Sequence, residues 1–144
     1  KEELLKEIKK FNIETQVIFA GTINYNELSK YYNLGNVFVM PSIKDEKGNV
    51  DASPVAMMEA MACGTPVVAT KFSGSADLIK DGETGFLVKD KDSNEIASSV
   101  IKILKMGKKG ETRKKVRKIA QHNFSNISVA KKYSSVFEFA FSHK

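Results

Sequence analysis

The chain has 144 residues, a hydrophobic content of 42% and a formal net charge of +6 at pH 7. A chain of this length forms one domain with a modest core, and its single cysteine excludes an intramolecular disulfide framework. No apolar run is long enough for a transmembrane helix or a signal peptide, so we expect a cytoplasmic protein.

The sequence opens inside an amphipathic helical pattern formed by Leu4, Leu5, Ile8 and Phe11. Its first residue is Lys1, and no strand precedes the pattern. We therefore expect a single domain that is a piece of a longer protein.

Four short runs rich in Val, Ile or Phe come next, and each is typical of a buried parallel strand. They are Val17–Ala20, Val37–Met40, Pro66–Ala69 and Phe86–Val88. Segments with helical period lie between these runs, at Asn26–Asn33, Pro54–Ala62 and Ser75–Lys80. Three further helices are predicted at Ser93–Lys105, Lys109–His122 and Ile127–Phe141. The alternation predicts an α/β fold, a Rossmann-like, doubly wound parallel sheet with a helical C-terminal extension.

The usual strand order of such a sheet has a consequence for this chain. In the order 3-2-1-4-5-6, Val17–Ala20 is the third strand and Val37–Met40 is the fourth. The first two strands belong between them, so we expect a gap with two unpaired edges. Because unpaired edges favour aggregation, the 144 residues alone are expected to be marginally stable or oligomeric.

The segment from Lys102 to Lys118 is strongly basic, with nine Lys or Arg residues against one acid, Glu111. A solvated helix face is the first interpretation of this pattern. Peripheral contact with an anionic membrane is the second, which would make the protein membrane-associated. No nucleic acid partner is expected, because no aromatic residues are interleaved for base stacking.

Residues 40–70 place polar groups at the joints between a strand, a loop, a helix and a second strand. The first strand ends at Pro41 and Ser42, and the helix carries Pro54 in its first turn. Backbone N–H groups at such a helix start point at whatever occupies the loop, which predicts an anion site. Asp51 and Glu59 lie eight positions apart around this helix start.

The stretch DASPVAMMEAMACGTPVVAT at 51–70 resembles glycosyltransferase family 4, retaining GT-B enzymes whose C-terminal half typically reads PS...EGxPxxxxEAMAxGxPVVAT. Asp51 stands where that family usually has Glu, and Ala52 where it usually has Gly. Further matches follow in register: VIFAG at 17–21, VFVMPS at 37–42, SGSADLI at 73–79, DGETGFLV at 81–88 and DKDSNEIASSVIKIL at 90–104.

The resemblance implies the donor-binding C-terminal half of a retaining glycosyltransferase with a nucleotide sugar as substrate and no cofactor or metal. The acceptor, a lipid or a glycan, would bind to an N-terminal domain outside this sequence, so the isolated chain would be inactive. Two alternatives stay open. One is an enzyme like the nucleotide-sugar 2-epimerases, and the other is a non-catalytic nucleotide-binding or partner-binding module.

The resemblance also assigns roles to the two acidic residues. Glu59 would accept hydrogen bonds from the ribose hydroxyls, for which a carboxylate is suited because it accepts from two hydroxyls at once. Asp51 would contact the transferred sugar or the positive charge that develops at its anomeric carbon, with a shorter reach than Glu. The alternatives are a solvent-facing helix Glu and a loop Asp in an Asx-turn.

Backbone groups would complete the site by the same resemblance. Ala52, Ser53, Val55 and Ala56 would donate N–H groups to the phosphates and sugar, whereas Pro54 has no N–H to donate. Ser53 is alternatively a simple helix N-cap.

The resemblance assigns the contact with the nucleotide base to one loop and the pocket wall to another. Gly21, Thr22 and Ile23 would lie against the nucleotide base, where a glycine allows close approach, and Ser42 would form part of the pocket wall. Without the resemblance, these residues are a turn and a loop hydroxyl.

Three other features are assigned no chemistry. Asp90-Lys91-Asp92 has the form of the D-x-D metal motif of a different glycosyltransferase fold, but it precedes a helix start, where acids commonly cap. Cys63 is predicted to be a small buried residue. His122 and His143 are not expected to be catalytic.

Overall fold

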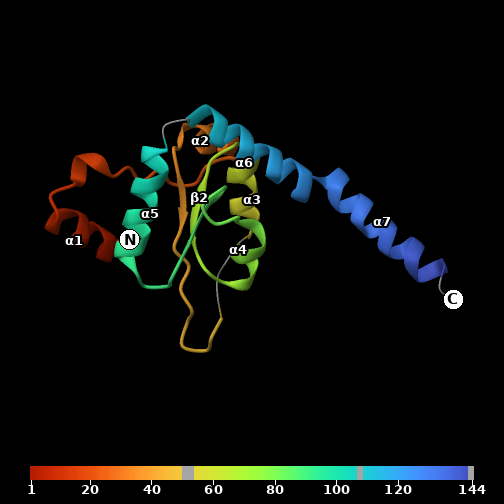
Figure 1. The fold of residues 1–144 in the computed structure, drawn as a ribbon. Coiled ribbons are helices and arrows are strands. Elements are labelled where there is room, and N and C mark those ends of the chain that lie inside the picture. Colours follow the sequence, from red (N-terminus) through yellow and green to blue (C-terminus); the bar gives the residue numbers. More distant parts are fainter. Residues whose placement is uncertain (50–53, 107–108, 143–144) are drawn as a thin grey trace.

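The computed structural model describes residues 1–49, 54–106 and 109–142. Helices and strands alternate from residue 25 to residue 105, as Figure 1 shows. The elements are α1 (Glu2–Lys10), α2 (Tyr25–Leu34), β1 (Phe38–Met40), α3 (Pro54–Ala62), β2 (Val67–Thr70), α4 (Ser73–Leu78), β3 (Gly85–Val88), α5 (Ser93–Lys105), α6 (Lys109–Phe124) and α7 (Asn126–Ser142), with a short 3-10 turn at Glu14–Gln16. The predicted α/β class with a helical C-terminal part is confirmed.

The three strands form one parallel sheet in the order β1-β2-β3. Phe38 of β1 lies opposite Val67 of β2, which in turn lies opposite Gly85 of β3. Parallel neighbours need a crossover connection, and α3 and α4 supply these two crossovers.

Apolar layers cover both faces of the sheet. Side chains alternate along β2, so Val67 and Ala69 pack with α3, α4 and α6, whereas Val68 packs with β3 and α5. The first layer includes the buried Met57, Met61, Leu78, Ile79, Val116 and Ala120, and the second includes Val88 and Ile103. Helices on both faces are what a doubly wound sheet requires.

Helix α3 ends at a left-handed glycine directly before β2. Gly64 has a φ of +80°, its N–H donates to the carbonyl of Met61, and the N–H of Thr65 donates to that of Ala60. This pair of bonds is the Schellman pattern, which closes a helix and turns the chain. It directs the chain from α3 into the buried strand β2.

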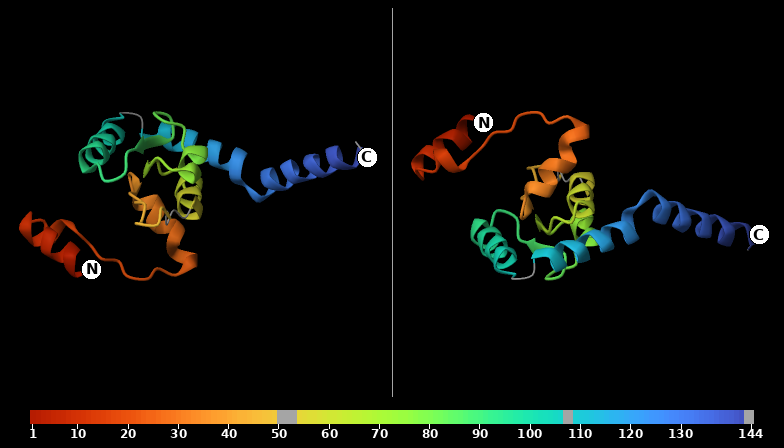
Figure 2. Two further views of the ribbon diagram at one scale, coloured as in Figure 1. Left: turned by 90° about the horizontal axis from the view of Figure 1, so that it is seen from below. Right: turned by 90° about the horizontal axis from the view of Figure 1, so that it is seen from above.

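The prediction of a strand at Val17–Ala20 is wrong, because within the described residues this segment joins no sheet. Ile18 is 89% exposed, and Figure 2 shows α1 and the chain leading to α2 standing away from the sheet. A strand needs a neighbour for its backbone hydrogen bonds. In the described part of the chain, β1 pairs with β2 alone. Residues 17–20 therefore have the apolar composition of a strand but no neighbouring strand to pair with in the described part of the chain.

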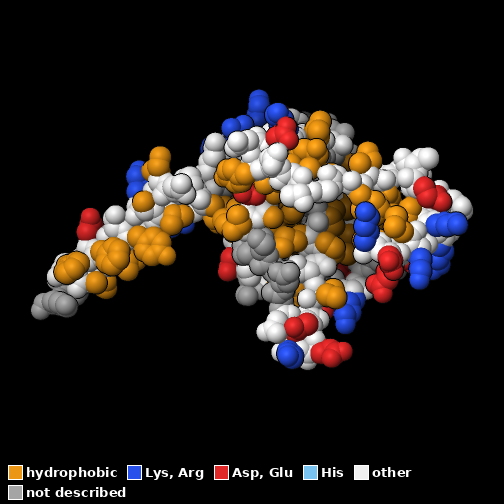
Figure 3. Space-filling model, turned by 180° about the vertical axis from the view of Figure 1, so that it is seen from behind, with side chains coloured by type: hydrophobic (Ala, Val, Ile, Leu, Met, Phe, Trp, Pro, Cys, Tyr) orange, Lys and Arg blue, Asp and Glu red, His pale blue; other side chains and the backbone are white. Residues whose placement is uncertain are grey.

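Helix α7 extends beyond the body of the domain (Figures 1 and 2). Figure 3 shows hydrophobic side chains along it, and the large exposed ones are Ile127, Val129, Tyr133, Val136, Phe137, Phe139 and Phe141. None of the helices in the described ranges is both long and apolar enough to cross a membrane.

Candidate functional site

A groove of about 350 Å³ lies between α2 and α3. From α2 it is lined by Tyr25, Asn26, Leu28, Ser29 and Tyr32, and from α3 by Glu59, Ala62 and Cys63. The spacing of three and four positions on each helix places these residues on one face, so two facing helices form the walls. Polar groups within an apolar groove are typical of a ligand site.

Glu59 is half-buried in this groove and points toward α2. Its Oε2 accepts a hydrogen bond of 3.1 Å from the hydroxyl of Tyr32. The structure therefore places the carboxylate in a groove with an ordered partner, unlike a freely solvated helix Glu.

The surroundings of Tyr32 hold its ring in place and raise the pKa of its hydroxyl. Its ring meets the ring of Phe38 edge to face, with centroids 5.7 Å apart, and the hydroxyl of Thr65 donates to its backbone carbonyl at 2.6 Å. Burial, together with the hydrogen bond to the Glu59 carboxylate and its negative charge, raises the pKa of Tyr32 to about 12. The phenol is therefore a stable proton donor to Glu59 at neutral pH.

Cys63 also lines the groove, at the end of α3. It is half-buried, which corrects the prediction of a buried residue, since the α2 side of its helix is left open by the groove. Burial raises the pKa of its thiol, although the positive charges of Arg117 and Arg113 act to lower that pKa. The thiol is therefore the weakly reactive, neutral form at neutral pH.

The residues predicted to bind the phosphates and the transferred sugar lie only partly within the described chain. Asp51, Ala52 and Ser53 fall outside the described residues. Val55, which is 55% exposed, and the half-buried Ala56 form the first turn of α3 after Pro54. Amides in the first turn of a helix have no partner within the helix, so they are available to an anion.

The loop residues predicted to contact the nucleotide lie before α2. Gly21 has a φ of +70°, Thr22 is exposed and Ile23 is half-buried. They precede Tyr25, the first groove residue of α2, by two to four positions. The turn thus leads directly into the wall of the groove.

Ser42 lies just beyond the carboxyl end of β1 and is half-buried. Its backbone carbonyl accepts a hydrogen bond of 2.7 Å from the hydroxyl of Thr70, the last residue of β2. The bond fixes the start of the β1–α3 loop against the neighbouring strand.

Asp92, one of the two acids before α5, acts as the helix cap. The carboxylate of Asp92 accepts from the backbone N–H of Glu95 at 2.8 Å, which confirms the predicted capping role. Among residues 1–49, 54–106 and 109–142, no three His, Cys, Asp or Glu side chains cluster as metal ligands would. His122 is exposed, and His143 lies outside the described residues.

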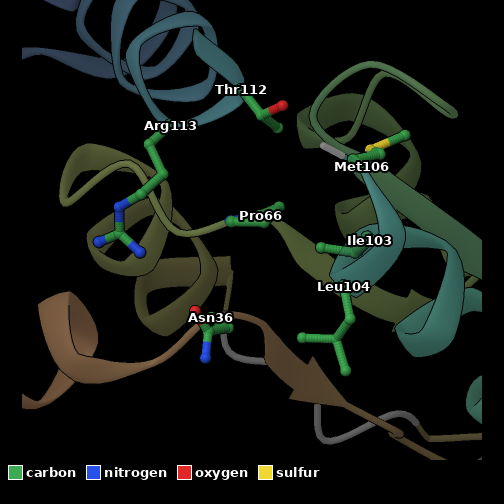
Figure 4. A pocket seen from close by; sticks show the side chains of 7 residues that line it. All are labelled: Asn36, Pro66, Ile103, Leu104, Met106, Thr112 and Arg113. Atoms are coloured by element: carbon green, nitrogen blue, oxygen red, sulfur yellow. The ribbon is translucent and has the colours of Figure 1, made fainter. Parts of the chain in front are cut away.

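A second, smaller cavity of about 40 Å³ lies near Pro66 at the start of β2 (Figure 4). Its lining is Asn36, Pro66, Ile103, Leu104, Met106, Thr112 and Arg113. In Figure 4 the guanidinium of Arg113 points away from Met106, and all its hydrogen bonds go to protein acceptors. This cavity is too small for a nucleotide, so the groove is the better candidate.

The basic segment is a solvated face only in part. Lys114, Arg117 and Lys118 are exposed, and Lys115 pairs with Glu83 at 3.2 Å. Arg113 is half-buried and hydrogen-bonded to backbone carbonyls, so the prediction of a solvated face is wrong at this residue.

Several groove residues were not predicted as site residues, Tyr32 and Tyr25 above all. A signal existed in the sequence, because positions 25, 28, 29 and 32 recur at helical spacing, and all of them but Tyr25 lie on the segment predicted to be a helix, Asn26–Asn33. The pattern does not say which neighbour that face meets, and the groove depends on that neighbour.

The chain matches known glycosyltransferases in sequence and in fold. Residues 1–123 match the family described as Glycosyl transferases group 1, so the chain belongs to this family. A curated relative is sulfoquinovosyl transferase SQD2 of Arabidopsis thaliana, which is 34% identical over 119 residues, 81% of this chain and 22% of the relative. The chain spans about a fifth to a third of the length of the curated relatives it matches.

Solved structures place the chain within the GT-B fold. Sucrose-phosphate synthase from Thermosynechococcus elongatus superposes with a TM-score of 0.78 at 29% identity, covering 99% of this chain and 35% of that one. HepE of Anabaena in complex with UDP and glucose gives 0.76 at 22% identity, covering 95% and 36%. The resemblance found in the sequence is thereby confirmed at the level of family and fold.

Proposed function

We propose that this chain is the nucleotide-sugar-binding part of a retaining glycosyltransferase. The observation that carries the proposal is the carboxylate of Glu59, which the hydroxyl of Tyr32 holds by a hydrogen bond in the groove between α2 and α3. Family membership supports the transferase class, and the solved HepE structure is a complex of that relative with UDP and glucose.

The groove suits the nucleoside. Glu59 would accept hydrogen bonds from the ribose, with Oε1 free of the bond from Tyr32. Gly21, Thr22 and Ile23, which lead into the α2 wall, would lie against the base. Ser42 would border the same pocket from the end of β1.

The first turn of α3 would take the diphosphate. Amides of Val55 and Ala56, joined by those of Ala52 and Ser53, would stabilise negative charge with the helix dipole. In the transfer, the bond between the anomeric carbon and the diphosphate oxygen breaks, and its electron pair leaves with the nucleoside diphosphate. The acceptor hydroxyl forms the new bond on the same face and gives its proton to the departing phosphate, while Asp51 would hold the sugar.

The acceptor is proposed to be a lipid or a glycan bound by another part of the protein, in the cytoplasm. The exposed cations of α6 would rest near an anionic membrane surface if the acceptor is a lipid. A sedimentation assay with vesicles of mixed neutral and anionic lipids tests this contact.

The decisive experiment is turnover by the full-length protein with UDP-, GDP- and ADP-sugars, after a thermal-shift panel selects the donor. Release of nucleoside diphosphate with sugar on an acceptor supports the proposal. An isomerised nucleotide sugar without release supports the 2-epimerase alternative. Tight binding without either product supports a non-catalytic module.

A further inference from the structure

The bond between Tyr32 and Glu59 joins two helices across the groove. The residues are 27 positions apart, the phenol is the donor, and the oxygen distance is 3.1 Å. Tyr32 occupies Oε2 and leaves Oε1 to a ligand. The bond therefore fixes the direction in which the carboxylate presents its second oxygen.

Tyr32 is itself fixed from two further sides. Its ring packs edge to face on Phe38 of β1, and its backbone carbonyl accepts the hydroxyl of Thr65, which is only 1% exposed. Tyr32 is half-buried and packs against the core, and an anchor held in this way transmits little motion to the residue it holds.

We propose that Tyr32 is a positioning residue for donor binding, whose hydroxyl holds the Glu59 carboxylate in the orientation that accepts the ribose hydroxyls. The inference rests on the proposed function. A free Glu side chain loses rotamer freedom when it binds a ligand, and this loss weakens affinity. The bond from Tyr32 imposes much of that order before the ligand arrives.

A purely structural bond predicts a different result. It would stabilise the packing of α2 on α3, and its loss would lower stability or weaken all ligands alike. Positioning of Glu59 affects only ligands that carry ribose hydroxyls. Discrimination between ribose and dideoxyribose is therefore the readout that separates the two roles.

The test uses Tyr32→Phe in the full-length protein, which removes the hydroxyl and keeps the ring. Tyr31→Phe is the matched control, an identical change on the exposed neighbouring residue of α2. Calorimetric titration with UDP, GDP and ADP is compared with titration by their 2′,3′-dideoxy counterparts. Tyr32→Phe should weaken the bound ribonucleotide about 3- to 10-fold, the effect of one hydrogen bond, and the dideoxy counterpart less than about twofold.

Two further variants complete the test. In a Glu59→Ala background, Tyr32→Phe should cost no further affinity, because there is no carboxylate left to orient. If Tyr32→Phe does not fold, Phe38→Leu loosens the ring while keeping the hydroxyl, and it should give the same ribose-selective loss.

The outcomes separate this inference from the proposed function. If the unaltered protein distinguishes ribose from dideoxyribose but Tyr32→Phe changes neither affinity, or both equally, the positioning role is overturned. If the unaltered protein binds none of the three diphosphates, or binds both sugar forms alike, the proposed function itself fails and the inference falls with it.

Discussion

The guanidinium of Arg113 on α6 donates a hydrogen bond of 2.8 Å to the backbone carbonyl of Gly35, 78 residues earlier in the chain. Its other terminal nitrogen lies 3.2 Å from the carbonyl of Asn33 and 3.3 Å from that of Cys63. These carbonyls end α2 and α3, where no intrahelical donors remain. One side chain thus joins both walls of the groove to α6.

We expect Arg113→Ala to lower the free energy of unfolding by about 2–3 kcal/mol, because charge-assisted bonds are lost and carbonyls are left without their donor. Arg113→Lys should recover only part of this, since an ammonium cannot span the same acceptors. Urea denaturation measures the change. Lys114→Ala, at an exposed neighbour, is the control and should stay within about 0.5 kcal/mol. An equal effect of the two alanine variants would show that the bonds contribute nothing.

Gly64 supplies a second stability test at the end of α3. A Cβ at this position would lie 2.8 Å from the carbonyl oxygen of Arg113, and its φ of +80° is unfavourable for other residues. Gly64→Ala should therefore cost more than the roughly 1–2 kcal/mol of backbone strain alone. Gly82→Ala is the matched control, with a φ of +74° and nothing within 4 Å of its Cβ position. Equal midpoints of urea unfolding for the two variants would contradict the close contact.

Local patterns predicted helices α3 and α5 well, whereas α4 begins and ends two residues before the predicted Ser75–Lys80. Pro54–Ala62 and Ser93–Lys105 match α3 and α5 at both ends, because Pro54 and Asp92 mark the helix starts and Gly64 marks an end. The three observed strands were also predicted to within one residue at each end. These elements are determined by caps and by apolar runs that are local in the sequence.

The failures were of another kind. Val17–Ala20 has the composition of a strand, but a strand also needs a paired neighbour, which the local pattern does not supply. Arg113 has the same charge as the exposed basic residues around it. It differs from them only because α6 packs against the ends of α2 and α3, where the Arg113 guanidinium finds backbone acceptors. The Tyr32 side of the groove likewise depends on which helix faces α3.

The role proposed for Glu59 predicts graded losses of donor affinity. Glu59→Ala in the full-length protein should weaken binding of the nucleotide sugar by about 1.5–3 kcal/mol, and Glu59→Gln should cost less because its amide keeps one acceptor. Titration calorimetry with the donor selected by thermal shift measures both. Glu27→Ala, an exposed Glu on α2, is the control and should leave affinity unchanged. Donor affinity equal to the original in Glu59→Ala would exclude the ribose contact.

The pKa of Tyr32, raised to about 12, predicts behaviour at high pH. The folded protein holds this proton more tightly than the unfolded chain, so the resulting stabilisation is complete below pH 10 and is lost as pH rises through about 12. Tyrosinate absorbance of the four tyrosines should show one late step, which Tyr32→Phe removes. Glu59→Gln removes the neighbouring charge and should move that step to lower pH. A late step that survives in Tyr32→Phe would assign the shift to another residue.

The exposed apolar stripe of α7 predicts how the 144 residues behave in solution. Val129, Tyr133, Val136, Phe137 and Phe141 recur on one face, and Phe137, 60% exposed, lies near its middle. Together with the open edge of β1, such a surface favours association, because burying it removes apolar area from water. We expect sedimentation velocity to show a larger species that grows with protein concentration.

Phe137→Lys should shift that distribution toward the monomer. Ser135→Lys is the matched control, since it adds the same charge two positions away, off the stripe, and removes no apolar surface. Because a general charge repulsion would act in both variants, only a difference between them identifies the stripe as the contact. If the unaltered chain is a monomer at every concentration, neither the stripe nor the β1 edge drives association.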